Sequence, residues 1–409
     1  MAFSVFLAMG NPPFGYEYSA NGRKVTDKGK GQGLLMERGA SAVSEPGFLP
    51  KLKRGRDFMK KSNFLAWVVL VAVIVCLPFL NGEACTRVVY LGSDGRILTA
   101  RSMDWKSDIE TNLWIFPRGM KRTGEVGPNS ATWTSKYGSV IASGYDISTT
   151  DGLNEAGLSA NLLWLVESEY PRWDGKKPGL TIAAWAQYVL DNFATVQEAV
   201  RELGEERFVI VTSNLPDEAR LATLHLSLSD SLGDSAILEY IEGRLVIHHG
   251  RDYQVMTNSP TFDRQLAVSQ YWKEIGGTVM LPGTNRAADR FVRALFYINA
   301  IPRTGDRLIA TASVFSVIRN VSVPFGISTA GQPNISSTRW RTVADHKSGI
   351  YYFESALTPN VFWVDLRKID FSAKGKVRKL SLGKDQRNVF AGDASSRFEN
   401  AEPFRFLGL

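Results

Sequence analysis

Apolar and polar positions alternate in short runs along residues 85–409, and longer runs with the spacing of a helical face lie between and after them. The short runs are rich in β-branched and aromatic residues, which is typical of strands. The expected strands cover residues 86–92, 96–103, 112–119, 139–146, 158–166, 208–213, 222–230, 235–249, 349–355 and 360–366. The expected helices cover residues 180–193, 196–203, 261–275, 286–300 and 311–321. This order predicts an α+β protein whose antiparallel sheets are layered with helices.

Two local patterns add detail to these elements. Ser93, Asp94 and Gly95 divide the first two expected strands, and an Asp-Gly pair in that position predicts a β-hairpin. Thr195, followed three residues later by Glu198, forms a capping box, which predicts that a helix begins there. No internal repeat and no long linker rich in Pro or Ser divides this part of the sequence, so we expect one domain.

Residues 64–80 (FLAWVVLVAVIVCLPFL) form the most apolar run of the chain and carry no charge. Lys60 and Lys61 precede this run, and polar and small residues follow it. A basic head, an apolar middle and a polar tail are the parts of a secretory signal peptide, which we place at residues 59–84. The run is also shorter than the ~20 apolar residues that span a bilayer comfortably.

The residues just before Cys85 predict where this signal peptide is cleaved. Gly82 and Ala84 place small residues at the third and first positions before Cys85, as signal peptidase requires. Cleavage there makes Cys85 the first residue of the mature chain. Two alternatives are an uncleaved membrane anchor, in which Trp67 and the long apolar core stay in lipid, and a lipoprotein. The lipoprotein is disfavoured because Gly82 and Glu83 stand where such signals normally carry Leu and a small residue.

Residues 1–58 mix Gly, Pro, Ser and Lys without a sustained period. A long polar leader before a signal peptide is unusual, whereas Met59 would be a natural start. We therefore expect residues 1–58 to be a disordered leader or the product of a misplaced translation start. Residues 1–84 hold eleven Lys and Arg against six Asp and Glu, so the net charge falls from +7 for the whole chain to +2 for residues 85–409. This balance gives no indication of nucleic-acid binding.

The chain has only two cysteines, and Cys85 is the only one outside the apolar run, because Cys76 lies within it. A single thiol in an exported protein pairs between chains or is kept free for a purpose. A lone cysteine more commonly serves as a small packing residue. The position of Cys85 at a cleavage site weakens that alternative, because chain ends are seldom deep in cores.

A cysteine at the first position carries its own base. An α-amino group titrates near ~7.7–8.0, so its neutral fraction can accept the thiol proton directly or through a water molecule. No histidine is needed for this chemistry. The chain has four histidines, His225, His248, His249 and His346. None lies in a cysteine-protease signature; a Cys/His protease remains a rival, although its cysteine normally lies on a helix, whereas Cys85 starts an expected strand.

Several motifs together resemble one family. ACTRVVY, followed by RSMDW from Arg101, is similar to the start of the choloylglycine hydrolase family, which includes penicillin V acylases and bile salt hydrolases. The similarity continues through DGLNEAGL (151–158), TNSPTFD (257–263), LPG with ADRFVR (281–293) and STRWRTVADHKSGIYYF (337–353). The resemblance implies an N-terminal-nucleophile (Ntn) hydrolase over residues 85–409, with a four-layer αββα sandwich of two antiparallel sheets between helical layers. It also implies a homotetramer that needs neither cofactor nor metal.

The resemblance assigns roles to five residues. Cys85 matches the nucleophile, and Arg101 and Asp104 match the Arg and Asp that hold and polarise the terminal amine and thiol. A nearby cation favours the thiolate, and a carboxylate can orient the amine. Asn258 matches the asparagine whose side-chain amide lines the oxyanion hole, and Arg290 matches a further active-site arginine. Without the motifs, each arginine would be read as half of a surface ion pair and the asparagine as a turn residue.

Trp164 departs from the pattern of bile salt hydrolases, which commonly have Asn at this position. The family uses the backbone N–H of this residue as the second oxyanion donor, so the substitution leaves that role intact. Trp164 and Trp105 would then present two flat apolar faces to the substrate, as in the Gram-negative penicillin V acylase-like branch. Such a site suits an aryl or alkyl acyl group and would crowd a steroid. The alternative is that both tryptophans are ordinary core residues.

These interpretations predict a periplasmic or secreted amidase that hydrolyses linear non-peptide C–N bonds of small molecules. Penicillin V or an N-acyl homoserine lactone is the expected substrate, and the protein should have no stable membrane association after signal cleavage. One alternative is a conjugated bile salt hydrolase. The other is a non-catalytic protein, anchored in the membrane or lipidated, in which Cys85 has no free amine.

Overall fold

The computed structural model describes residues 85–409 apart from 217–219, 277–278, 328–335 and 359. The predicted leader and the predicted signal peptide lie outside the described residues, so both stay predictions. Within the described part of the chain, no helix has the length and apolar character needed to cross a membrane. The same residues contain no group of three or more His, Cys, Asp or Glu side chains placed to hold a metal ion.

One sheet has seven strands, all antiparallel to their neighbours except the last pair. Its order across the sheet is β14 (Val255–Met256), β1 (Thr86–Leu91), β2 (Ile97–Trp105), β15 (Ser337–Asp345), β16 (Ile350–Ser355), β17 (Val361–Asp365) and β19 (Gly392–Asp393). The two N-terminal strands therefore lie inside the sheet, between β14 and β15. This placement puts the residue that precedes β1 close to both β14 and β2.

The second sheet has nine antiparallel strands. Its order is β13 (Arg244–His249), β12 (Ser235–Ile241), β11 (Leu224–Ser229), β8 (Ser159–Trp164), β7 (Ser148–Asn154), β6 (Ser139–Gly144), β3 (Leu113–Phe116), β18 (Arg378–Leu380) and β20 (Glu399–Asn400). Two small pairs complete the strands, β4 (Lys121–Thr123) with β5 (Thr132–Thr134), and β9 (Gly179–Thr181) with β10 (Val209–Val211).

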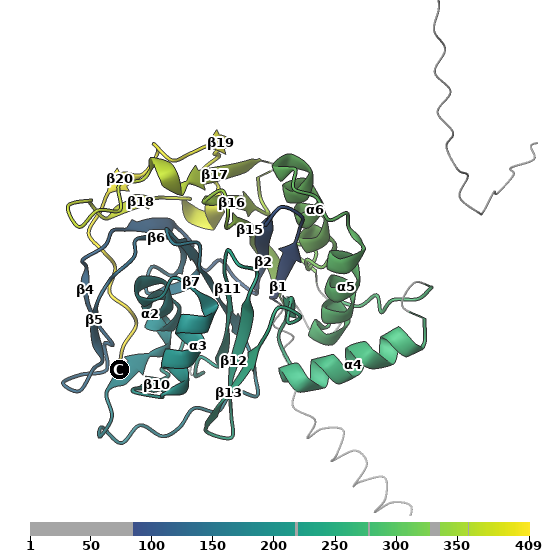
Figure 1. Cartoon of the computed structure of the whole chain (residues 1–409). Coiled ribbons are helices and arrows are strands. Elements are labelled where there is room, and N and C mark those ends of the chain that lie inside the picture. The colour runs from purple at the N-terminus through teal and green to yellow at the C-terminus, as the bar shows by residue number, and fades with distance from the viewer. Residues whose placement is uncertain (1–84, 217–219, 277–278, 328–335, 359) are drawn as a thin grey trace, which may run out of the picture. The chain divides into compact units, whose positions relative to one another are not determined.

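Helices cover the outer face of each sheet (Figure 1). The nine-stranded sheet carries α2 (Trp185–Asn192) and α3 (Val196–Gly204). The seven-stranded sheet carries α5 (Ala287–Ala300) and α6 (Arg307–Asn320), and α4 (Phe262–Glu274) packs on α5. Short 3₁₀ turns are η1 (Ile182–Ala184), η2 (Leu366–Lys368) and η3 (Lys384–Gln386). The predicted α+β class and its αββα layering are confirmed.

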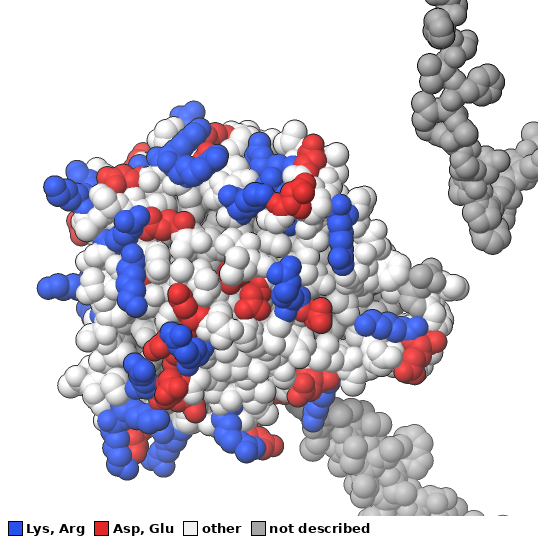
Figure 2. All heavy atoms as spheres, in the orientation of Figure 1, with Lys and Arg blue, Asp and Glu red and all other residues white. Residues whose placement is uncertain are grey.

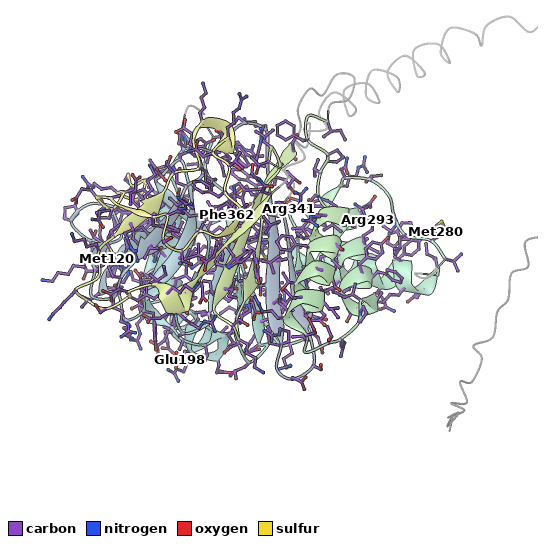
Figure 3. The ribbon with its side chains drawn as sticks, turned by 90° about the horizontal axis from the view of Figure 1, so that it is seen from above. Met120, Glu198, Met280, Arg293, Arg341 and Phe362 are labelled. Atoms are coloured by element: carbon purple, nitrogen blue, oxygen red, sulfur yellow. The ribbon has the colours of Figure 1, made fainter. Side chains whose placement is uncertain are left out.

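In Figure 3, seen from above, Arg293 marks helix α5, Arg341 marks β15 of the seven-stranded sheet, and Glu198 marks helix α3, which packs on the nine-stranded sheet. One apolar core lies under α5 and α6 and extends between the sheets, and a second lies between the nine-stranded sheet and α2 and α3. On the visible surface, basic and acidic side chains are intermixed (Figure 2), in keeping with the small net charge of residues 85–409.

The two local predictions are confirmed. β1 and β2 form an antiparallel hairpin, and Asp94 and Gly95 in its turn have positive φ of 54° and 66°. The hydroxyl of Thr195 accepts a hydrogen bond from the backbone N–H of Glu198 at 3.2 Å and so caps α3. The Glu198 carboxylate reaches back one residue further than expected and accepts from Ala194 N–H at 2.9 Å.

Several elements differ from the sequence prediction. The expected single strand 235–249 is a hairpin of β12 and β13, because Glu242 and Gly243 turn the chain with positive φ of 51° and 74°. The expected helix 180–193 begins as strand β9 and turns helical only after Thr181, whose hydroxyl accepts from Ala183 N–H and starts η1. The segment 148–154 is strand β7, and 337–345 is strand β15, although neither was predicted as a strand. Both carry polar side chains that are buried between layers, so their sequences do not alternate as a half-exposed strand does.

Candidate active site

Cys85 immediately precedes β1, and its side chain is 3% exposed. Because Thr86 pairs with Ser102 on β2, the thiol lies beside the last third of that strand. The Sγ atom is 3.8 Å from Arg101 Nη2, 4.0 Å from Met103 Sδ and 3.8 Å from the carbonyl oxygen of Asp104. The thiol is thus held in a buried position with a cation next to it.

Arg101 crosses from one sheet to the other. Its guanidinium donates to the carbonyl oxygens of Leu162 on β8, at 2.9 Å, and of Thr150 on β7, at 3.3 Å. The carboxylate of Asp151 is 3.9 Å away, and the guanidinium carbon lies 4.7 Å from the Trp340 ring centroid. These contacts bury Arg101 to 1% exposure, so it is not half of a surface ion pair.

Arg290 on α5 supports Cys85 from the other face of the sheet. Its guanidinium donates to the carbonyl oxygen of Cys85 at 2.8 Å and to the hydroxyl of Thr86. It also donates to Asn258 Oδ1 at 3.0 Å and lies 3.7 Å from the Asp104 carboxylate. A fully buried arginine therefore links the residue before β1 to the loop that carries Asn258.

The Asp104 carboxylate is also fully buried, and it points toward the helical layer. It accepts hydrogen bonds from the hydroxyls of Thr338 and of Ser102, the latter at 3.2 Å. In this arrangement the main-chain oxygen of Asp104, rather than its carboxylate, contacts the Cys85 thiol, and the carboxylate acts on the site mainly through Arg290.

Asn258 follows β14 and lies between the start of β1 and the end of β8. Its Oδ1 atom accepts from Cys85 N–H, and its Nδ2 atom donates to the carbonyl oxygen of Trp164 at 2.7 Å. Gln265 on α4 donates to the Asn258 carbonyl oxygen and fixes the loop. An amide nitrogen carries two hydrogens, so Nδ2 keeps a second one for another acceptor.

The backbone N–H of Trp164 is directed to the same region. Leu165 N–H donates to Thr223 O at 3.0 Å, and antiparallel strands exchange such bonds at alternate residues. The N–H of Trp164 therefore points away from β11 and toward the side of β7. The pairing of β7 with β8 ends at Asn161, so β7 does not cover this N–H. Asn258 and Trp164 thus place an amide and a backbone N–H next to Cys85.

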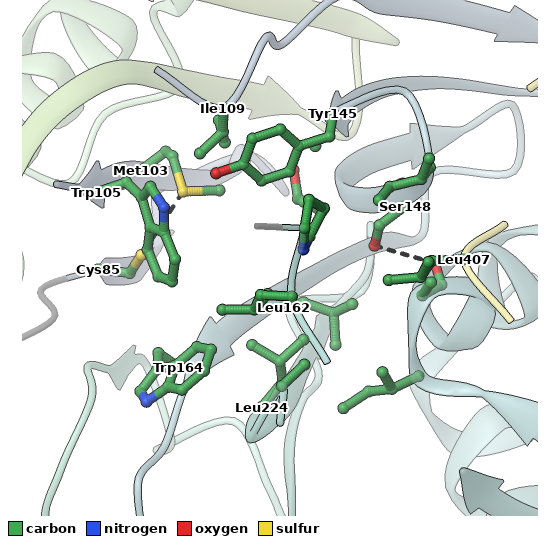
Figure 4. A pocket seen from close by; sticks show the side chains of 18 of the residues that line it. Cys85, Met103, Trp105, Ile109, Tyr145, Ser148, Leu162, Trp164, Leu224 and Leu407 are labelled. Atoms are coloured by element: carbon green, nitrogen blue, oxygen red, sulfur yellow. Dashed lines mark hydrogen bonds between the residues drawn. The ribbon is translucent and has the colours of Figure 1, made fainter. Parts of the chain in front are cut away.

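An apolar pocket opens at the thiol, and its empty volume is about 760 Å³ with the mouth included. Trp105 and Trp164 flank the pocket next to Cys85 (Figure 4), with ring centroids 5.6 Å apart and planes inclined by 53°. The guanidinium of Arg220 covers the Trp164 ring at 4.1 Å. Small-molecule sites are typically apolar cavities with a few polar groups, and the lining of this pocket fits that description.

Burial raises the pKa of the Cys85 thiol, and the Arg101 guanidinium opposes this shift by favouring the thiolate. The buried Asp104 carboxylate raises the thiol pKa further. Burial also raises the pKa of Asp104 itself to about 6, although Arg290 and the Thr338 hydroxyl act in the opposite direction. The thiol is therefore a buried acid that needs a base to ionise.

The raised pKa of Asp104 predicts a pH-dependent contribution to stability. The folded protein binds this proton at higher pH than the unfolded chain, where Asp titrates near ~3.9. The contribution of Asp104 to the free energy of unfolding is therefore largest below pH ~4. It falls by about 3 kcal/mol as the pH rises to ~6 and is constant above that.

Asp104→Asn should remove this dependence, because the amide oxygen still accepts hydrogen bonds but does not ionise. The measurement is urea unfolding of both proteins between acid and neutral pH, since other buried carboxyls titrate equally in both and cancel in the difference. If the free energies of unfolding of the two proteins changed in parallel with pH, the result would contradict a raised pKa for Asp104.

The structure brings six of the sequence-predicted residues into one site, and Asp104 adjoins it. The six are Cys85, Arg101, Trp105, Trp164, Asn258 and Arg290. Met103 and Thr338 are contacting residues without a predicted role. Met103 touches the thiol and Thr338 holds the Asp104 carboxylate, and both lie in motifs that carry the family resemblance. The sequence gives no signal that separates these two residues from the other motif positions, and only their contacts in the structure reveal their roles.

Two antiparallel sheets between helical layers, with a cysteine at the start of an inner strand, define the class of Ntn-hydrolase folds. The chain belongs to the linear amide C–N hydrolases, choloylglycine hydrolase family, whose model matches residues 85–379. It is therefore a hydrolase of linear amides, and the family predicted from the sequence motifs is confirmed.

Individual relatives refine this assignment. A penicillin V acylase of Pectobacterium atrosepticum is 59% identical over 348 residues, which cover 80% of this chain and 93% of that protein. The structure of penicillin V acylase from Agrobacterium tumefaciens superposes with a TM-score of 0.75 at 68% identity, covering 80% of this chain and 100% of that one. A bile salt hydrolase/transferase of Clostridium perfringens is more distant, at 27% identity over 69% of this chain and 93% of that protein.

Proposed function

We propose that the protein is an exported amidase in which signal cleavage frees Cys85 as the N-terminal nucleophile. The observation that carries this proposal is the placement of the Cys85 thiol, which faces an apolar pocket beside Arg101 and next to Asn258. The location in the periplasm or medium is proposed from the predicted signal peptide, and a homotetrameric assembly from the family resemblance. Light scattering of the purified protein tests the assembly.

The reaction requires a base because burial raises the thiol pKa. The freed α-amine of Cys85 takes the thiol proton as Sγ attacks the amide carbon. The second N–H of Asn258 and the backbone N–H of Trp164 stabilise the negative oxygen that forms. The C–N bond then breaks, and the leaving nitrogen takes the proton from the ammonium group. Water hydrolyses the resulting thioester, which releases the carboxylic acid and restores the thiol.

The pocket favours an aryl or alkyl acyl group, such as that of penicillin V or an N-acyl homoserine lactone. Both tryptophan rings border it, and neither indole N–H has a hydrogen-bond partner among the described residues. The indole N–H of a buried tryptophan usually has a hydrogen-bond partner. Its unpaired state therefore favours a pocket wall that contacts the substrate over an ordinary core position. The greater distance of the bile salt hydrolase relative points the same way.

The test is to express the full chain with export, recover the released protein and determine its N-terminal sequence. A chain that begins at Cys85 and hydrolyses penicillin V supports the proposal. Residues still attached before Cys85 in an active protein would exclude the N-terminal amine as base. Comparison of kcat/KM on penicillin V, an N-acyl homoserine lactone and a glycine-conjugated bile salt then ranks the substrate classes.

Trp164→Ala and Trp105→Ala should each weaken binding of the acyl group. Truncating a large aromatic ring that packs on the substrate costs ~2–3 kcal/mol by area, or about 30- to 150-fold. The ring stabilises bound substrate and transition state equally, so its removal raises KM and spares kcat, and Trp164→Ala keeps its backbone N–H. Trp272→Ala on α4, outside the pocket lining, is the matched control.

Trp164→Asn introduces the residue common in bile salt hydrolases and tests the steric part of this argument. We expect poorer cleavage of penicillin V and of long-chain homoserine lactones, with some gain on glycine-conjugated bile salts. The measurement is kcat/KM for the three substrate classes. A wild-type preference for bile salts, or an unchanged ranking in the variants, would show that the two rings do not select the acyl group.

A further inference from the structure

The side of the pocket opposite Cys85 is lined by a residue of the C-terminal tail, residues 401–409. Figure 4 shows Leu407 across the pocket from Cys85, on the side where Ser148 lies. The family match ends at residue 379, so this wall comes from a segment beyond the part of the chain that the family model describes. The main-chain hydrogen bonds described for Leu407 go to Ile147 and Thr181, neither of which is proposed to perform the chemistry.

Both main-chain groups of Leu407 are fixed to segments that line the pocket. Its N–H donates to the carbonyl oxygen of Ile147 at 2.9 Å, and its carbonyl oxygen accepts from the hydroxyl of Thr181. Thr181 directly precedes Ile182, and Ile147 and Ile182 are themselves lining residues. The leucine side chain is therefore held against the cavity and does not project from a free end.

Aromatic packing outside the pocket fixes the rest of the tail. The Phe404 ring packs edge-on against Trp114 and Phe116 of β3, with centroids 5.3 and 5.6 Å away, and against Phe406 at 5.4 Å. The Arg122 guanidinium lies 4.3 Å from the Phe116 ring and 5.5 Å from the Phe406 ring. The position of Leu407 is thus set by contacts that leave the catalytic groups untouched.

We propose that Leu407 closes the acyl pocket opposite the nucleophile and sets the longest acyl chain that is hydrolysed efficiently. This inference rests on the proposed function, because it assigns the acyl group of the amide to this cavity. Each methylene that gains a buried apolar contact improves binding about four-fold, whereas one that meets a fixed wall gains nothing. A rigid end wall therefore produces a sharp limit in chain length.

The experiment measures kcat/KM for a homologous series of straight-chain N-acyl homoserine lactones with Leu407→Ala, Leu407→Trp and the wild type. Removing the leucine side chain should move the preferred chain length up by about two methylenes and raise the long-to-short ratio about 15-fold. Tryptophan should lower the ratio by a similar factor and spare the shortest substrates. Leu409→Ala is the matched control, because Leu409 is 73% exposed and outside the lining.

A second readout does not depend on turnover. Straight-chain fatty acids, the products of such hydrolysis, should raise the Tm of the wild type up to a limiting length, and Leu407→Ala should extend that limit. Unchanged chain-length profiles in both variants, with an active wild type, would overturn the role of Leu407. A wild type that hydrolyses no linear amide would refute the proposed function. In that case, a limiting fatty-acid length in the Tm series that Leu407→Ala extends would still show that Leu407 closes the pocket.

Discussion

Cys85→Ala is expected to abolish amide hydrolysis and to leave the fold and substrate binding nearly intact. The proposed reaction has a single nucleophilic atom, and alanine provides none. The substitution removes a single sulfur atom whose hydrogen-bond contacts are weak, at 3.8–4.0 Å, so it should change stability little. The measurements are kcat with penicillin V, the Tm, and the Kd of substrate for the inactive variant.

Two controls make this result specific. Cys85→Ser should keep weak activity, because a hydroxyl is a poorer nucleophile near neutral pH but occupies the same position. N-terminal sequencing of each variant must show the same cleavage, so that loss of activity is not loss of processing. An alanine variant with full activity and a correct N-terminus would refute the nucleophile assignment.

The elements that the sequence predicted well are those with local determinants. The turn between β1 and β2 depends on Asp94 and Gly95, and the start of α3 depends on Thr195 with Glu198. Each of these interactions joins residues within a few positions of one another, so the sequence alone specifies it.

The strands that were missed depend on distant partners. Asp151 on β7 is 1% exposed, and polar residues are normally taken as surface or loop positions. It is satisfied by Asn161 on β8, at 2.6 Å, and by the hydroxyl of Tyr351 on β16. Asn161 lies on the neighbouring strand of the same sheet, and Tyr351 lies on the other sheet. The pattern of polar and apolar residues alone identifies neither partner, because it specifies neither strand pairing nor the packing of the two sheets.

The active site shows the same division. Family motifs supplied Cys85, Arg101 and Asn258, and the fold brings them into contact. The direction of the Asp104 carboxylate, toward Arg290, follows from the alternation of side chains along β2 once the helical layer is in place. The tail that carries Leu407 reaches the pocket through aromatic packing on β3, a strand far away in the sequence, which no local pattern reveals.

Asn258→Ala is expected to lower kcat by on the order of 10²–10³, with a much smaller change in KM. Loss of one oxyanion donor has about this effect, because the donor acts on charge that develops only in the transition state. The structure gives Asn258 a second task, since its Oδ1 atom accepts from Cys85 N–H and from Arg290. Alanine removes both functions and cannot separate them.

Asn258→Asp separates the two functions. The carboxylate has nearly the same shape and keeps an acceptor for Cys85 N–H and Arg290, but when ionised it has no N–H to offer the oxyanion. If Asn258 stabilises the oxyanion, the aspartate variant should be at least as impaired in kcat as the alanine variant. Ser259→Ala, in the same loop, is the matched control and should retain activity, because the Ser259 hydroxyl contacts Glu167 and Val166 N–H rather than the thiol. Restored turnover in Asn258→Asp would instead assign the residue to positioning the N-terminal amine, and an effect confined to KM would assign it to substrate binding.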